Sequence, residues 1–309
     1  MKVIRLERTL HKKLSDSTGC LGTIEWIYEH GLYVLGSDGH PFYFIDGKLL
    51  HIPFGIIVDQ LLEKWTQKVF LQKGDRLFKK GHLIYRWSEN DCNIQFLPKE
   101  VIDLNRTLYK FPPSSEIIMG WIKCLANEIL NGGRFEGMGG TLTVLRDRFS
   151  QLIPESSFPL SLCSRYALSD ILCMLRSTAN GDLEGFQSAW EKLIGLGPGL
   201  TPSADDMLLG FLASQKILSS CFWKKIKFSK LKTLLVEVAR EKTTPIASEF
   251  LRYALEGVFS EILYNVFEAL SQSDASEIDS SAIKLFLEWG HSSGTDTLVG
   301  VVLGLTTLC

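Results

Sequence analysis

The chain has 309 residues, which is enough for one large domain or two ordinary domains with hydrophobic cores of their own. Hydrophobic residues make up 45% and charged residues 22%, as in soluble globular proteins, and the net charge of −2 excludes the basic field of a typical nucleic-acid-binding protein. The seven cysteines are odd in number and never spaced as Cys-x-x-Cys, so we expect reduced thiols in a cytoplasmic protein.

The first third of the chain predicts β-structure. Short runs rich in Ile, Val, Tyr and Phe alternate with turn residues, and we expect strands at 22–28, 31–35, 41–45, 48–52, 77–78, 82–85 and 94–96. Asp46-Gly47 indicates a type I′ hairpin between the third and fourth of these strands. Many short strands at this spacing predict a small β-barrel or sandwich-like domain.

The pattern changes at the double proline Pro112-Pro113. Ser115 and Glu116 then make a plausible helix start, and apolar residues recur at helical spacing. We expect further helices at 163–178, 183–194, 203–219, 229–241, 245–256, 259–271, 280–289 and 293–308. The predicted class is α+β, with a β-rich domain over 1–112 and an all-α domain over 113–309.

Neither end of the chain predicts a membrane segment. The first 14 residues carry scattered charges and have no apolar core of a signal peptide. The apolar segment 297–308 is shorter than the roughly 18–20 residues that span a bilayer, so we interpret it as a buried helix.

Two stretches of the helical region repeat one pattern. Residues 195–210 read GLGPGLTPSADDMLLG, and residues 290–304 read GHSSGTDTLVGVVLG. Aligned on Ser203 and Ser293, both give Ser-x-x-Asp, a leucine two residues after the Asp and a glycine four residues after it. Each copy follows one expected helix and begins another, so the helical domain contains two similar helix–glycine loop–helix units.

The repeated pattern predicts how each second helix begins. We expect Ser203 to cap its helix while Asp206 reaches back to the Ser203 N–H, a capping box with Asp in place of Glu. Ser293 and Asp296 would do the same in the second copy. Gly210 and Gly300, one turn further on, would let another helix approach closely.

The same loops are candidate ligand sites. Amides at a helix N-terminus favour an anion, yet the neighbouring aspartates add negative charge there. A ligand with an anionic end and an amide end resolves this conflict, because amides bind the anion and carboxylates accept from the N–H groups. The candidate catalytic residues are Asp205, Asp206, Asp296 and His291, the last as an anion donor or proton carrier. The candidate ligand-binding residues are Gly197, Gly199, Leu200, Thr201, Ser203, Ser292, Ser293, Gly294, Thr295, Thr244, Ser248 and Arg134.

Other binding motifs fit these loops less well. No Gly-Lys-Ser/Thr of a phosphate-binding P-loop follows, and a loop from helix to helix differs from the strand-to-helix loop of a dinucleotide site. A divalent metal at Asp205 and Asp206 is an open alternative, although neighbouring helical residues point about 100° apart. We therefore expect no cofactor. A purely structural role, helix capping, also stays open for each copy.

The longest motif resembles a known family. GLGPGLTPSADDMLLGFL is similar to the G-x-G-x-GLTPSGDD-x-L-x-G motif of the AllH family, long described as a domain of unknown function. TTPIASEFLRYALEG and GHSSGTDTLVGVVLGL resemble the later blocks of that family. The resemblance is dense over about 183–308 and weak over the β-region. Ala204 stands where the family usually has glycine.

The resemblance implies a subunit of a multi-subunit oxamate carbamoyltransferase of allantoin (purine) breakdown. That enzyme converts oxalurate and phosphate to oxamate and carbamoyl phosphate. It implies a small anionic substrate (phosphate, carbamoyl phosphate, oxalurate or oxamate) and other carbamoyltransferase subunits as partners, with no nucleic acid and no membrane. The Ser-x-Arg-Thr-Arg phosphate motif of ordinary carbamoyltransferases is absent, and the resemblance does not place the catalytic residues in this chain.

Two further hypotheses stay open. The chain is a non-catalytic scaffold or ligand-binding subunit if the paired loops only build a helical core. It is a metal-dependent hydrolase if Asp205 and Asp206 hold a metal ion.

Overall fold

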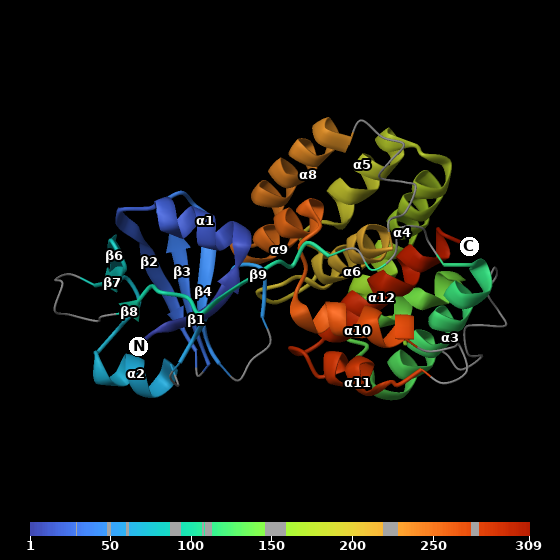
Figure 1. The fold of residues 1–309 in the computed structure, drawn as a ribbon. Helices are drawn as coiled ribbons and strands as arrows, with labels where there is room; N and C mark the ends of the chain where they lie inside the picture. The colour runs from blue at the N-terminus through green and yellow to red at the C-terminus, as the bar shows by residue number, and fades with distance from the viewer. Residues whose placement is uncertain are drawn as a thin grey trace. The chain divides into compact units, whose positions relative to one another are not determined.

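The computed structural model describes residues 1–28, 30–47, 51–59, 62–86, 94–106, 108, 113–145, 159–218, 228–272 and 278–309. The chain forms two compact units, one of residues 1–104 with 259–261 and one of residues 105–258 with 262–309. A curled β-sheet is followed by a helical region, so the predicted α+β class is confirmed (Figure 1). The domain boundary predicted at 112 lies outside the described residues.

The sheet of the first unit has nine strands among the described residues. They are β1 Val3–Glu7, β2 Gly19–Ile27, β3 Gly31–Gly36, β4 Pro41–Asp46, β5 Gly55–Val58, β6 Arg76–Lys80, β7 Leu83–Tyr85, β8 Ile94–Gln95 and β9 Glu100–Ile102. Their order is β8-β7-β6-β2-β3-β4-β5-β1-β9. A single bridge between Lys2 and Gln95 joins the β8 edge to the start of the chain, so the sheet curls upon itself.

Two helices complete this unit, α1 Arg8–Asp16 and α2 Leu62–Lys68. The sequence predicted neither. The side chain of Glu7 caps α1 by accepting the N–H groups of Thr9 and Leu10. Leu10 and Leu14 then pack into the apolar core of the curled sheet, because residues four apart lie on the same helix face.

The hairpin predicted at Asp46-Gly47 is wrong. Strand β4 pairs with β5 in parallel, and its register places Tyr43 opposite Gly55. A type I′ turn requires positive φ at both central residues, and Gly47 is not among the residues with positive φ. The chain instead crosses over to begin β5 beside β1. Part of the strand predicted at 48–52 lies outside the described residues.

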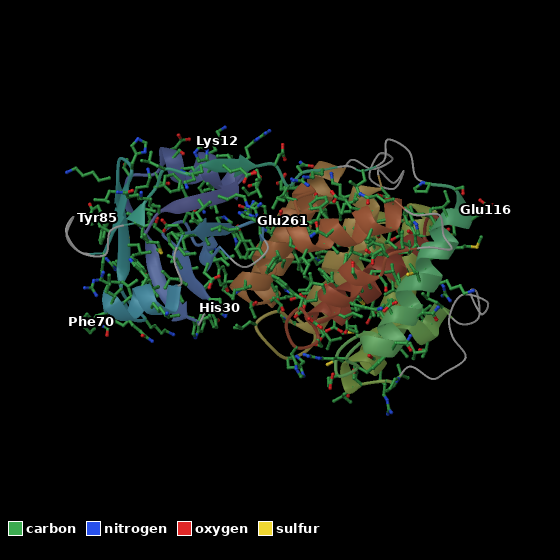
Figure 2. The ribbon with its side chains drawn as sticks, turned by 60° about the horizontal axis from the view of Figure 1, so that its bottom comes forward. Lys12, His30, Phe70, Tyr85, Glu116 and Glu261 are labelled. Atoms are coloured by element: carbon green, nitrogen blue, oxygen red, sulfur yellow. The ribbon has the colours of Figure 1, made fainter. Side chains whose placement is uncertain are left out.

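The second unit is helical, as predicted. Its elements are α3 Ser115–Gly132, η1 Gly139–Leu145, α4 Leu162–Asn180, α5 Leu183–Leu193, α6 Ser203–Ile217, α8 Phe228–Lys242, α9 Pro245–Glu256, α10 Glu261–Gln272, α11 Ser281–Leu287 and α12 Ser293–Thr306. Helix α3 begins where expected, with Ser114 as its cap. Glu116, in the first turn, lies at the surface, where its charge complements the helix dipole (Figure 2).

Helices α6 and α12 form the centre of this unit (Figure 1). They pack against each other, and α12 also contacts α3 and η1. Every residue of α12 from Gly294 to Thr306 is buried, which explains why this segment is so apolar. Within the described residues, no helix is both long and apolar enough to cross a membrane.

Candidate functional site

The loop before α6 depends on its glycines. Gly195, Gly197 and Gly199 all have positive φ, at 76°, 119° and 103°, where L side chains are strained. A Cβ on Gly197 would also lie 2.7 Å from the backbone nitrogen of Ser203. The loop therefore folds back tightly onto the start of α6.

The capping boxes predicted for both copies are wrong. Pro202 occupies the cap position of α6, Ser203 is the first helical residue, and no side chain caps the helix. The carboxylate of Asp206 accepts from the hydroxyl of Thr201 at 3.0 Å instead of turning back to Ser203. In the second copy Ser292 takes the cap position, again without a hydrogen bond from a backbone N–H of the helix to its side chain. The side chains expected to cap their own helices are used elsewhere.

Each copy of the motif bonds to the other copy. The Ser203 hydroxyl bonds to the carboxylate of Asp296, and the Ser293 hydroxyl bonds to the carboxylate of Asp206. The hydroxyls of Thr201 and Ser293 lie 3.1 Å apart. The two motifs, 90 positions apart in the sequence, therefore form one group, which we call the carboxylate–hydroxyl cluster: Asp205, Asp206, Asp296, Thr201, Ser203, Ser292 and Ser293.

The glycines of the motif create this closeness. A Cβ on Gly210 would overlap the carbonyl oxygen of Thr297, and a Cβ on Gly300 would overlap the carbonyl oxygen of Met207. The two contacts are equivalent, because Gly210 and Gly300 hold the same place in the two copies, and so do Met207 and Thr297. Helices α6 and α12 are therefore related by a local two-fold axis where they cross. Both glycines were expected to let another helix approach closely. In each case that helix is the one that carries the other copy of the motif.

Asp205 and Asp206 point to different partners. Asp205 is 2% exposed and accepts from the Gly195 N–H at 2.8 Å and from the Thr243 hydroxyl. Burial raises its pKa to about 6. Asp206 is buried beside Thr201 and Ser293, and burial together with the charges of Asp296 and Asp205 raises its pKa well above the ordinary value.

Asp296 is fully buried at the start of α12. Its carboxylate accepts from the Met138 N–H at 2.5 Å and from the Ser292 hydroxyl at 2.9 Å. Burial raises its pKa to about 6, while these hydrogen bonds and that from Ser203 oppose the rise. The cluster thus contains three carboxyl groups whose pKa values are raised by burial.

A third segment reaches the cluster, and the sequence interpretation missed it. Gly137 lies so close to Asp296 that an added Cβ would overlap both carboxylate oxygens, and Met138 supplies the N–H bond. The only sequence signal was the glycine density of NGGRFEGMGG over 131–140. That signal indicated a loop, but not its neighbour.

Arg134 and His291 lie beside the cluster, and both are exposed. The Arg134 guanidinium donates to the carbonyls of Gly290 and His291, at 3.1 and 2.6 Å, and its backbone N–H donates to the Thr295 hydroxyl at 2.9 Å. Arg134 therefore fixes the loop before α12. Its guanidinium bonds to backbone carbonyls here, although the sequence suggested an anion as its partner.

Thr244 joins α9 to the glycine loop. Its hydroxyl caps α9 by accepting the Ala247 N–H at 3.1 Å and donates to the carbonyl of the half-exposed Leu200. Ser248 follows in the first turn of α9. The Thr244 hydroxyl therefore holds the glycine loop at the start of α9.

Some of the predicted anion-binding amides are already used. The Ala204 N–H donates to the Leu196 carbonyl at 3.0 Å, and the Gly294 N–H donates to the Trp289 carbonyl at 3.0 Å. The described residues contain no group of three or more His, Cys, Asp or Glu side chains placed to hold a metal ion. What the cluster offers chemically is a set of buried carboxyl oxygens that accept N–H donors and exchange protons.

Fold and site together define an α+β protein with a buried carboxylate–hydroxyl cluster between two paired helices. Residues 193–305, which include both motifs, match the family model described as oxamate carbamoyltransferase subunit AllH. The resemblance inferred from the motifs is thereby confirmed for this part of the chain. No solved structure matches the chain.

Proposed function

We propose that the chain is a cytoplasmic subunit of an oxamate carbamoyltransferase-like enzyme and that the carboxylate–hydroxyl cluster binds a small ligand with an anionic and an amide end. The observation that carries this proposal is the exchange of Ser203–Asp296 and Ser293–Asp206 bonds between the two motifs. Both motifs lie within the matched region. A merely repeated helix start would not require the copies to share their polar side chains.

The amide end of the ligand belongs with the carboxyl groups. Buried carboxylates are strong acceptors for N–H donors, and a carbamoyl group supplies two such donors. For the anionic end we propose the amides of Gly197, Gly199 and Ser293, because those of Ala204 and Gly294 already donate to carbonyls. Positive φ at Gly197 and Gly199 lets the backbone approach a ligand closely.

The transfer itself needs a proton donor. A phosphate oxygen bonds to the carbamoyl carbon of oxalurate, the bond from that carbon to the oxamate nitrogen breaks, and this nitrogen takes a proton. Asp206 suits that role, because burial and the charges of Asp296 and Asp205 raise the pKa of its carboxyl group well above the ordinary value and so favour the protonated form. The other subunits complete the enzyme.

Neutral substitutions in the cluster test the proposal. In the assembled enzyme, Asp206→Asn and Asp296→Asn should each lower carbamoyl phosphate formation by at least about 100-fold, the usual contribution of general acid–base catalysis. Both variants should stay folded, and replacing a buried carboxyl group by a neutral amide should not lower the free energy of unfolding near neutral pH. Asp46→Asn, at a buried aspartate of the first unit bonded to His30, is the matched control and should keep its activity. Calorimetry should show binding of oxamate or carbamoyl phosphate by the intact assembly.

A non-catalytic scaffold is the second candidate. The amide bonds of Ala204 and Gly294 favour it, because they close part of the N-termini to ligands. If carbamoyl transfer survives both cluster substitutions while stability falls, the scaffold is the correct description. Loss of activity on chelation would instead favour the metal-dependent hydrolase.

A further inference from the structure

The peptide bond between Gly137 and Met138 has hydrogen-bond partners at both ends. Its N–H donates to Oδ1 of Asp296 at 2.5 Å. Its carbonyl oxygen accepts from the hydroxyls of Ser161 and Ser164, at 2.6 and 2.7 Å. One peptide unit therefore connects two serines at the start of α4 with a carboxylate at the start of α12.

Local structure fixes both serines in this arrangement. Ser161 is the cap of α4, and its oxygen accepts the Ser164 N–H at 3.0 Å, which leaves its O–H directed at Gly137. Ser164 is fully buried. Gly137 has no room for a side chain, because an added Cβ would also lie 2.6 Å from the Ser203 hydroxyl oxygen.

We propose that Ser161 and Ser164 are positioning residues of the candidate site, which act on Asp296 through the Gly137–Met138 peptide. Two O–H donors on a carbonyl increase the polarity of its peptide, and the N–H at the other end becomes a stronger donor. The serines thereby hold the Asp296 carboxylate in place and favour its charged form. The catalytic meaning of this relay rests on the proposed function; the relay itself does not.

The inference extends the site beyond the matched region. Residues 137, 161 and 164 precede residue 193, where the family match begins. Nothing in the repeated motif indicates a partner for Asp296 in this part of the chain.

Other groups also act on Asp296. Asp206 of α6 and Glu136 of the 131–140 loop bring negative charge toward it, and burial disfavours its ionised form. Among the hydrogen bonds that lower the pKa of Asp296, the one from the Met138 N–H has the largest effect, ahead of those from Ser203 and Ser292. Weakening this one bond should therefore be visible in the titration of Asp296.

The test is the titration of Asp296 in the full-length protein without ligand. The ¹³C signal of its carboxyl carbon, assigned with Asp296→Asn, should report an apparent pKa near 6. Ser164→Ala should raise this pKa by about 0.5 to 1 unit. Thr178→Val is the matched control, because Thr178 is buried on the same helix and its hydroxyl donates to the Met174 carbonyl; its Asp296 titration should match that of the wild type.

Ser161→Ala gives a second measurement if Ser164→Ala does not fold, because Ser161 is only half-buried. An Asp296 titration unchanged in the folded variant overturns the relay. Carbamoyl transfer is measured separately in the assembled enzyme. If the serine variants raise the pKa of Asp296 but no wild-type assembly transfers a carbamoyl group, the relay is supported and the proposed function is refuted. If the pKa of Asp296 is unchanged in the variants while the wild-type enzyme is active, the relay is refuted and the proposed function is supported.

Discussion

At the scale of single residues, the aspartates of the cluster are held by neutral donors. In the described part of the chain, Asp205, Asp206 and Asp296 receive hydrogen bonds from hydroxyls and amides. The adjacent Arg134 gives its guanidinium to backbone carbonyls instead. Burial raises the pKa of each of these carboxyl groups. Hydrogen bonds from hydroxyls and amides hold these acidic groups in place, and burial favours their protonated forms.

Arg134→Lys tests whether the guanidinium fixes the loop before α12. A lysine ammonium is a point charge that lacks the planar fork, so it should lose one of the two carbonyl bonds. We expect the free energy of unfolding to fall by about 1 kcal/mol and the amides of residues 290–295 to exchange hydrogen faster. Arg165→Lys, on the exposed surface of α4, is the control. Equal exchange rates in the two variants would contradict this role.

At the scale of elements, the periodicity of the sequence predicted the helices well and their contacts poorly. The helix predicted at 245–256 has the same bounds as α9, because a proline at its first position and a glycine after its end mark both termini. The pairing of Ser203 with Asp296 was not predictable. The pattern Ser-x-x-Asp is the same whether the two residues cap their own helix or bond to the other copy of the motif. The hairpin predicted at Asp46-Gly47 was wrong for a related reason. Two residues cannot indicate that the next strand, β5, pairs in parallel with β4 and lies between β4 and β1.

Gly210→Ala and Gly300→Ala test the crossing of α6 and α12. Each added Cβ would overlap a backbone carbonyl of the other helix, so the helices must separate. We expect each variant to lose about 3 kcal/mol of unfolding free energy, or to fail to fold, and the two losses to be similar because the contacts are equivalent. Gly132→Ala on α3 is the control, since its Cβ would first meet a Leu287 side-chain carbon at 3.4 Å. A tolerated Gly210→Ala would refute the close crossing.

At the scale of the whole molecule, the candidate site depends on segments from across the second unit. The glycine loop, the start of α12 and the 131–140 loop meet at Asp206 and Asp296, and the first turn of α4 bonds to the Gly137 carbonyl of the 131–140 loop. The carboxyl groups of Asp206 and Asp296 become buried when the second unit folds. Their protonation is therefore coupled to the folding of this unit. The sequence could indicate the residues of the two motifs, but burial of this depth is a property of the assembled helices.

The pH dependence of stability tests this coupling. Asp205 and Asp296 have a pKa of about 6 in the folded protein, against 3.8 for an ordinary aspartate. Between these values the folded state binds more protons than the unfolded state, so unfolding free energy falls as pH rises from about 4 to 6. Asp205→Asn removes one contribution and should gain stability over the wild type by up to about 3 kcal/mol between pH 4 and 7.5. Urea denaturation followed by circular dichroism measures this difference. Asp16→Asn, on the exposed end of α1, controls for the change in charge. If the unfolding free energies of the wild type and of Asp205→Asn change in parallel across this pH range, Asp205 is not buried as described.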